Sequence, residues 1–142
     1  MGLIRVNIEL INADDTAVAS RGFIKQEEIR RITTPALVDS GAYMLCINEN
    51  IANQLGLKTI ETEEAILADG SLKRVNIVGP IEIRFGNRRT HQDAMILPGN
   101  SEVFLGAIPM EDMDVVIDPL KQTLTPHPDR PYMAGTVLKG IR

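Results

Sequence analysis

The residues with the clearest chemical potential are Asp39, Ser40 and Gly41, within the stretch "ALVDSGAYM" (Ala36–Met44). The apolar run before Asp39 predicts a buried strand that ends at the carboxylate. A carboxylate at that position must be exposed at the strand's end, paired with a cation, or made to share a proton, because an isolated buried charge is costly. A purely structural interpretation is also open, in which Asp39 forms an Asx-type turn and Gly41 supplies an unusual backbone angle.

Other reactive side chains lack the spacing of a known kind of site. His91 and His127 lie far apart in the sequence and Cys46 is isolated, so no zinc-ligand pattern exists. The acidic run at 111–118 lacks the glycine and the bidentate glutamate of a calcium loop. No glycine-rich phosphate loop and no Ser-His-Asp set stands out. We therefore expect neither a metal nor another cofactor.

The composition is typical of a globular domain with an aliphatic core, because 44% of the 142 residues are hydrophobic and only 4% are aromatic. The net charge of −4, without a long basic stripe, gives no support to a nucleic-acid partner. The single cysteine, Cys46, lies in the apolar run "MLCI", which favours a buried thiol and a reducing compartment. We expect no signal peptide and no membrane-spanning segment, hence a cytoplasmic protein without a membrane partner.

Many short strands separated by turn signals predict one mainly β, mostly antiparallel domain over residues 1–142. We expect residues 12–15 to break the chain after a first strand, and residues 16–28 to form a loop with a helical turn near Gly22. The clearest helix begins after Asn48, a good N-cap, and ends at Gly56. Asp69 and Gly70 predict a type I′ hairpin. A proline-containing tail occupies residues 125–142.

Three features together resemble the retropepsin-like aspartic peptidases, the single-domain relatives of pepsin. The first is Asp39-Ser40-Gly41-Ala42 between the apolar runs "PALV" and "YMLCI". The second is the hairpin with Asp69-Gly70 at its tip, and the third is "VFLGAI", an apolar pair followed by Gly106. The resemblance covers roughly Leu3 to Thr125.

The resemblance implies a closed retropepsin-like β-barrel with one or two short helices. It also implies a homodimer in which each chain donates Asp39 to a carboxylate pair that hydrolyses a peptide or protein substrate. Ser40 and Gly41 would support the catalytic loop, and the tail at 125–142 is a candidate for the dimer interface. The implied substrate-binding positions are Ala42, Ala68, Asp69, Gly70, Phe104, Leu105 and Gly106.

Two positions depart from the family's pattern. Viral members commonly carry an acidic residue where this chain has Tyr43, and an arginine where it has Ala107. Losing both partners leaves no unpaired buried charge. The alternative to an enzyme is a non-catalytic module of the same fold, serving dimerisation or peptide binding, because a fold alone does not fix an activity.

Overall fold

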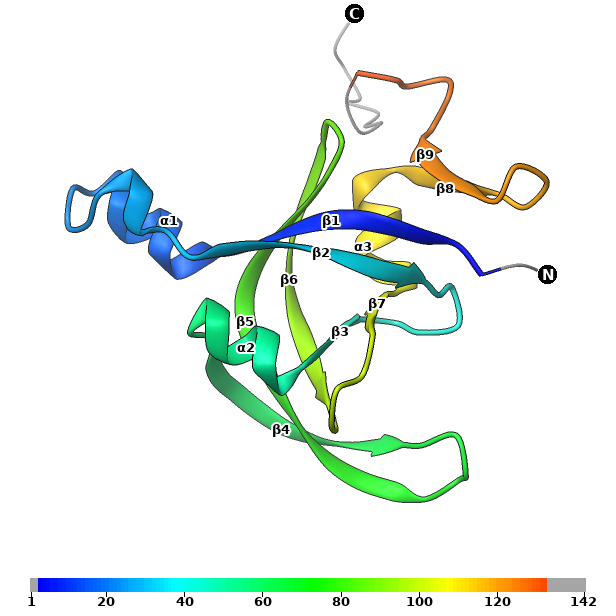
Figure 1. Ribbon diagram of the computed structural model, residues 1–142, viewed down its shortest axis with the longest axis horizontal. Helices are drawn as coiled ribbons and strands as arrows, with labels where there is room; N and C mark the ends of the chain where they lie inside the picture. The colour runs from blue at the N-terminus through cyan, green and yellow to red at the C-terminus, as the bar shows by residue number, and fades with distance from the viewer. Residues whose placement is uncertain (1–2, 133–142) are drawn as a thin grey trace, which may run out of the picture.

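Residues 3–132, which the computed structural model describes, form β-strands of 3 to 14 residues interspersed with short helices (Figure 1). The strands are β1 (Arg5–Asn12), β2 (Arg31–Val38), β3 (Leu45–Asn48), β4 (Lys58–Ile66), β5 (Leu72–Phe85), β6 (Arg88–Leu97), β7 (Val103–Leu105), β8 (Val115–Asp118) and β9 (Thr123–Pro126). The helices are α1 (Ala13–Ser20), the 3-10 helix η1 (Gln26–Glu28), α2 (Glu49–Leu55) and α3 (Ala107–Met113).

Six of the strands close into a barrel in the order β1-β2-β7-β3-β6-β5, because β1 also pairs with β5. Pairing is antiparallel except for β2 with β7 and β3 with β6, which run parallel. The strand β4 lies outside the ring and pairs with β5 alone, and β8 and β9 form a separate two-stranded sheet. The predicted mainly β barrel is therefore confirmed, with one α-helix more than expected.

Aliphatic side chains fill the barrel, as the low aromatic content predicts. The largest fully buried ones include Ile8, Leu10, Leu45, Ile47, Leu55, Ile77, Ile81, Ile83, Leu105 and Met113. The helix α2 contributes Leu55 to this core, and α3 contributes Met113. Burial of these apolar surfaces is the main force that holds the helices against the barrel.

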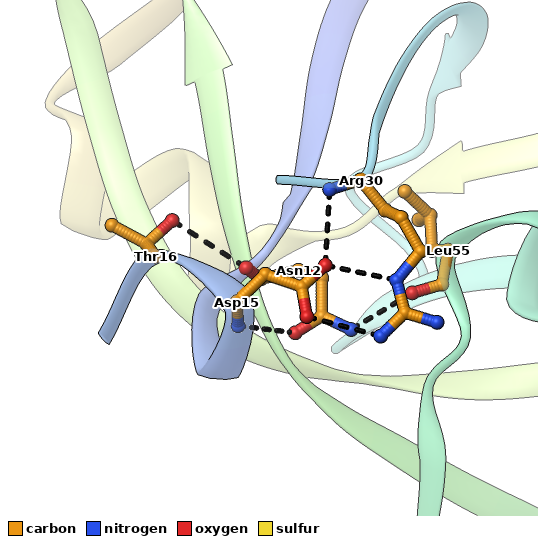
Figure 2. A network of polar contacts seen from close by, with 5 residues as sticks. All are labelled: Asn12, Asp15, Thr16, Arg30 and Leu55. Atoms are coloured by element: carbon orange, nitrogen blue, oxygen red, sulfur yellow. Dashed lines mark hydrogen bonds and ion pairs between the residues drawn. The ribbon is translucent and has the colours of Figure 1, made fainter. Parts of the chain in front are cut away.

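The additional helix is α1, in a region expected to be a break followed by a loop. The Asn12 side chain caps it by accepting a hydrogen bond from the backbone N–H of Asp15 at 3.0 Å. The Asp15 carboxylate accepts three more from Arg30, whose backbone N, Nε and Nη2 lie 2.9–3.0 Å away (Figure 2). Asn12 Nδ2 also donates to the Leu55 carbonyl at 2.8 Å. The helix is thus stabilised both by a local N-cap and by Arg30, which lies 15 residues from Asp15 in the sequence.

The helix α2 confirms both predicted caps. Asn48 Oδ1 accepts from the backbone N–H of Ile51 at 2.9 Å, and Gly56 has the left-handed φ of 61°. The left-handed φ favours glycine at residue 56, and an added Cβ would also displace the guanidinium of Arg30.

The hairpin between β4 and β5 is confirmed, but its predicted type I′ turn is wrong. Gly70 has a φ of 83°, whereas Asp69 is absent from the positive-φ residues among those described. The backbone N–H of Gly70 donates to the Leu67 carbonyl, and the Asp69 carboxylate accepts from Ser71 N at 2.9 Å and Ser71 Oγ at 2.6 Å. The loop is a three-residue type with glycine in the left-handed region.

We expect Asp15→Asn to destabilise the fold by about 1–3 kcal/mol at neutral pH, because hydrogen bonds between charged groups are lost. Arg30 hydrogen bonds hold the pKa of Asp15 below its ordinary value of 3.8. A depressed pKa stabilises the folded state above the unfolded pKa, and this contribution disappears as the pH falls through the folded pKa. The penalty should therefore shrink below about pH 4. Urea unfolding at neutral and acidic pH measures it.

The matched control is Asp14→Asn, which removes the neighbouring carboxylate. Asp14 is exposed and its only ion pair among the described residues joins Lys58 at 3.2 Å, so we expect no measurable loss of stability. Equal penalties for both variants, or a penalty at Asp15 that is independent of pH, would contradict the proposed role of the network.

Candidate active site

The loop that carries Asp39 crosses over the end of β7. The strand β7 lies between β2 and β3, parallel to the first and antiparallel to the second. The end of β2, the end of β7 and the start of β3 are therefore on the same side of the barrel (Figure 1). Residues 39–44 must bridge from β2 to β3 across the point where the chain leaves β7. This topology brings Asp39 next to Leu105 and Gly106.

Backbone hydrogen bonds fix Asp39 in this loop. Its N–H donates to the Leu105 carbonyl at 3.0 Å, and its carbonyl accepts from the N–H of Ala42 at 3.1 Å. Its carboxylate Oδ1 accepts from the N–H of Gly41 at 2.9 Å. This bond forms the Asx-type turn of the structural interpretation, but Gly41 lacks the positive φ that would make its backbone angle unusual. Glycine fits residue 41 because of space: an added Cβ would lie 3.2 Å from Asp39 Oδ1, a tight contact.

Gly106 lies directly under the same loop. An added Cβ would contact the Met44 carbonyl oxygen and would lie 2.8 Å from the Ala42 carbonyl oxygen. The next two residues bind the loop: Ala107 N donates to the Ala42 carbonyl at 2.7 Å, and Ile108 N to the Tyr43 carbonyl at 3.0 Å. The third motif of the sequence therefore supports the first through backbone contacts.

The residues near Asp39 differ in exposure and in whether their polar groups are free to bind a ligand or a partner. Ser40 is exposed, and its hydroxyl makes no hydrogen bond to any residue that the structure describes. Ala42 is half-buried. Cys46 lies in the buried strand β3, and burial, followed by the negative charge of Asp39, raises the pKa of its thiol to about 11. The thiol is therefore protonated and a poor nucleophile at neutral pH.

A cavity of about 300 Å³ opens beside Asp39 and Ser40. The end of β2 and the segment before β1, joined by the Val38 N–H donating to the Ile4 carbonyl at 2.8 Å, line it together with the β8–β9 hairpin. Its remaining lining residues are Leu3, Ile4, Leu37, Val38, Ile117, Pro119 and Gln122. None of these seven residues is among the substrate-binding positions that the resemblance implies. No local signal could have found Ile117 or Gln122, because their position depends on how the hairpin packs.

The other predicted substrate-binding residues occupy two places. Phe104 is half-buried and the Leu105 side chain is fully buried, so Leu105 contributes to the loop through its carbonyl. Ala68, Asp69 and Gly70 are exposed at the tip of the β4–β5 hairpin. In Figure 1 this tip extends toward the same side of the view as the β2–β3 loop, and the two are separate.

Among residues 3–132 no group of three or more His, Cys, Asp or Glu side chains is arranged to hold a metal ion. Within the same residues, no helix has the length and apolar character needed to cross a bilayer. The end of the 125–142 tail, from residue 133 onward, lies outside the described residues, so its predicted place at an interface stays a prediction.

A family model matches residues 25–112, and its description is "gag-polyprotein putative aspartyl protease". The matched segment covers well over half of the 142 residues and contains the Asp39 loop, the β4–β5 hairpin and Gly106. No curated protein matches the chain significantly.

We expect Gly106→Ala to lower the stability by about 1–3 kcal/mol, because a backbone carbonyl must move to admit the methyl group. The Gly41 amide, which binds the Asp39 carboxylate, should shift in an NMR spectrum of the folded variant. Gly99→Ala is the control, since its added Cβ meets nothing within 4 Å and only its φ of 70° is unfavourable. A Gly41 resonance that stays in place would show that Gly106 does not position the loop.

Proposed function

The chain belongs to the gag-polyprotein aspartyl protease family, and from that premise we propose that it is an aspartic endopeptidase completed by a second copy of itself. Each chain has one Asp-Ser-Gly triplet, at residues 39–41. A carboxylate pair therefore requires two chains, each of which supplies one Asp39. The observation that carries the proposal is the position of Asp39. Its loop is held by backbone hydrogen bonds to residues 105–108, and it borders a cavity.

The pair would work by holding one proton between two carboxylates, because like charges a few ångströms apart do not both ionise readily. The ionised carboxylate takes a proton from water as the water oxygen attacks the peptide carbonyl carbon. The protonated carboxylate donates its proton toward the carbonyl oxygen. Collapse of this tetrahedral intermediate breaks the C–N bond, and the nitrogen leaves with a proton as an amine.

The apolar surface near Asp39 supports a homodimer. Leu3 and Ile117, which line the cavity beside Asp39, have exposed fractions of 66% and 37%. Tyr43 and Ile108, which are joined by a backbone hydrogen bond, have exposed fractions of 78% and 45%. Exposed apolar groups gathered at one place are typical of an interaction site. The unused hydroxyl of Ser40 could bind the partner's backbone across the same interface.

The β4–β5 hairpin supports a role in substrate binding. The strand β4 is exposed along nearly all its length and pairs only with β5, and the tip residues 68–70 are exposed too. We propose that the hairpin closes over an extended peptide, which would bind as an added strand mainly through its backbone. Closure would exclude water from the carboxylate pair.

The first test is cleavage of an unbiased peptide library by wild type, Asp39→Asn and the control Asp112→Asn. Asp112 is exposed on α3, so its substitution should leave cleavage intact. Asp39→Asn should abolish cleavage while the protein stays folded and dimeric. A dimeric wild type that cleaves nothing would instead favour the non-catalytic peptide-binding module.

Mixing chains tests whether the site needs two copies of Asp39. Random exchange of equal amounts of wild type and Asp39→Asn leaves about one quarter of the dimers with two aspartates. Cleavage should therefore fall to about a quarter of that of wild type at the same total concentration. A fall to only one half would show that each chain acts alone. Equal mixing with Asp112→Asn should cause no fall.

The cleavage rate should depend on pH as a bell-shaped curve, because the pair needs one proton and one negative charge. Losing the proton at higher pH removes the acid, and gaining a second at lower pH removes the base. Measuring kcat/KM against pH under conditions where the dimer persists tests this. A rate that rises steadily with pH would contradict a shared proton.

A further inference from the structure

A polar groove lies away from the cavity beside Asp39, on the outer face of β1, β5 and β6. Its volume is about 320 Å³. The helix α1 and the 3-10 helix η1 border it with Thr16 and Gln26, and Ile11 and Ile29 supply apolar lining. Its charged lining residues are Glu9, Arg31, Glu82, Arg84 and Arg89.

Strand register sets these charges opposite one another. Arg84 on β5 pairs with Arg89 on β6 and with Glu9 on β1. Glu82 pairs with His91 on β6. Residues that pair across neighbouring strands extend from the same face of a sheet, so the two guanidiniums lie on one face. Like charges that are directly opposite destabilise a sheet unless an opposite charge compensates them.

The carboxylates of the groove are already engaged. Glu82 is 4% exposed, and its oxygens lie 2.5 Å from Arg84 Nε and 3.3 Å from His91 Nε2. Glu9 lies 3.8 Å from Arg31 Nη1. The buried Glu82 therefore binds Arg84 through Nε, and the terminal nitrogens of Arg84 donate no hydrogen bond to any residue that the structure describes.

Arg89 is the unpaired cation of this set. Its side chain is exposed and makes no hydrogen bond or ion pair with any residue between 3 and 132. Three guanidiniums against two carboxylates give the groove one net positive charge when His91 is neutral. Guanidinium groups bind carboxylates in a fixed two-point geometry. One added carboxylate would neutralise the groove, whereas a doubly charged phosphate would be repelled by Glu9 and Glu82.

We propose that this groove binds a glutamate or aspartate side chain in an acidic segment of a protein partner. Arg89 and the free nitrogens of Arg84 hold the carboxylate, and Arg31 lies at the opposite wall. The lining residues Ile11 and Ile29 accept the apolar part of the bound segment. The groove is thus a docking site for acidic chains.

The docking site is separate from the catalytic loop. Arg31 begins β2 and Asp39 follows its last residue, so the strand alone places them about 25 Å apart. In Figure 1 the beginning of β2 and α1 lie at the left and the β2–β3 loop at the right. A partner bound here leaves the cavity beside Asp39 open, and the proposal holds whether or not the chain cleaves peptides.

The test is calorimetric binding of a short peptide of alternating glutamate and alanine, blocked at both ends, to the Asp39→Asn protein. This background prevents cleavage, so the result is independent of the proposed activity. We expect Arg89→Gln to weaken binding about tenfold, because a charged hydrogen bond is lost. Glu9→Gln should strengthen binding, because it raises the net charge of the groove. Arg74→Gln, an exposed arginine elsewhere on β5, should bind like the parent.

Two further probes identify what is bound. The same peptide with glutamine in place of glutamate should not bind, and inorganic phosphate should bind more weakly than the acidic peptide. The proposal is overturned if the acidic peptide fails to bind, or if Arg89→Gln and Arg74→Gln have equal effects. It is also overturned if phosphate binds at least as tightly as the peptide, since the groove would then be a general anion site.

Discussion

The structure depends most on the crossing of the backbone at Gly106. Because β7 lies between β2 and β3, the loop from β2 must pass over the end of β7. Only a residue without a side chain leaves room there, since a Cβ at residue 106 would meet the carbonyls of Ala42 and Met44. The close approach in turn lets the Asp39 N–H reach the Leu105 carbonyl. The position of the carboxylate follows from the topology of the barrel rather than from contacts of the carboxylate itself.

The two departures from the viral pattern, Tyr43 and Ala107, lie at the same crossing. Tyr43 and Ala107 replace an acidic residue and an arginine that commonly pair in viral members. In this chain the backbones of the same two segments are joined by hydrogen bonds at 2.7 and 3.0 Å. Neither Tyr43 nor Ala107 leaves a charge buried without a partner. Backbone hydrogen bonds therefore hold the loop against α3 without the ion pair.

The parts of the fold that are encoded locally could be predicted from the sequence. Asn48 and Gly56 mark the ends of α2, and Asp69 with Gly70 marks the hairpin, because caps and turns depend on neighbouring residues. Helix α1 also has a local signal, the N-cap Asn12, but the groups that bind the Asp15 carboxylate come from Arg30, 15 residues away. The Asp39 loop and Gly106 were identified as motifs. Their contact, and the place of Ile117 beside Asp39, depend on strand order, which no local pattern contains.

The carboxylates at the two ends of the barrel differ in their partners: those at one end form ion pairs with arginines, whereas Asp39 at the other end does not. Asp15 and Glu82 lie against guanidiniums of their own chain, so their charges are satisfied within it. Asp39 has only the Gly41 N–H as a hydrogen-bond donor to its carboxylate among the described residues. A fold that surrounds its structural carboxylates with arginine therefore leaves this one without a cation. In the proposed dimer a second carboxylate would share a proton with Asp39 and leave one negative charge on the pair, whereas a neighbouring cation would favour ionisation of both carboxylates and oppose the shared proton.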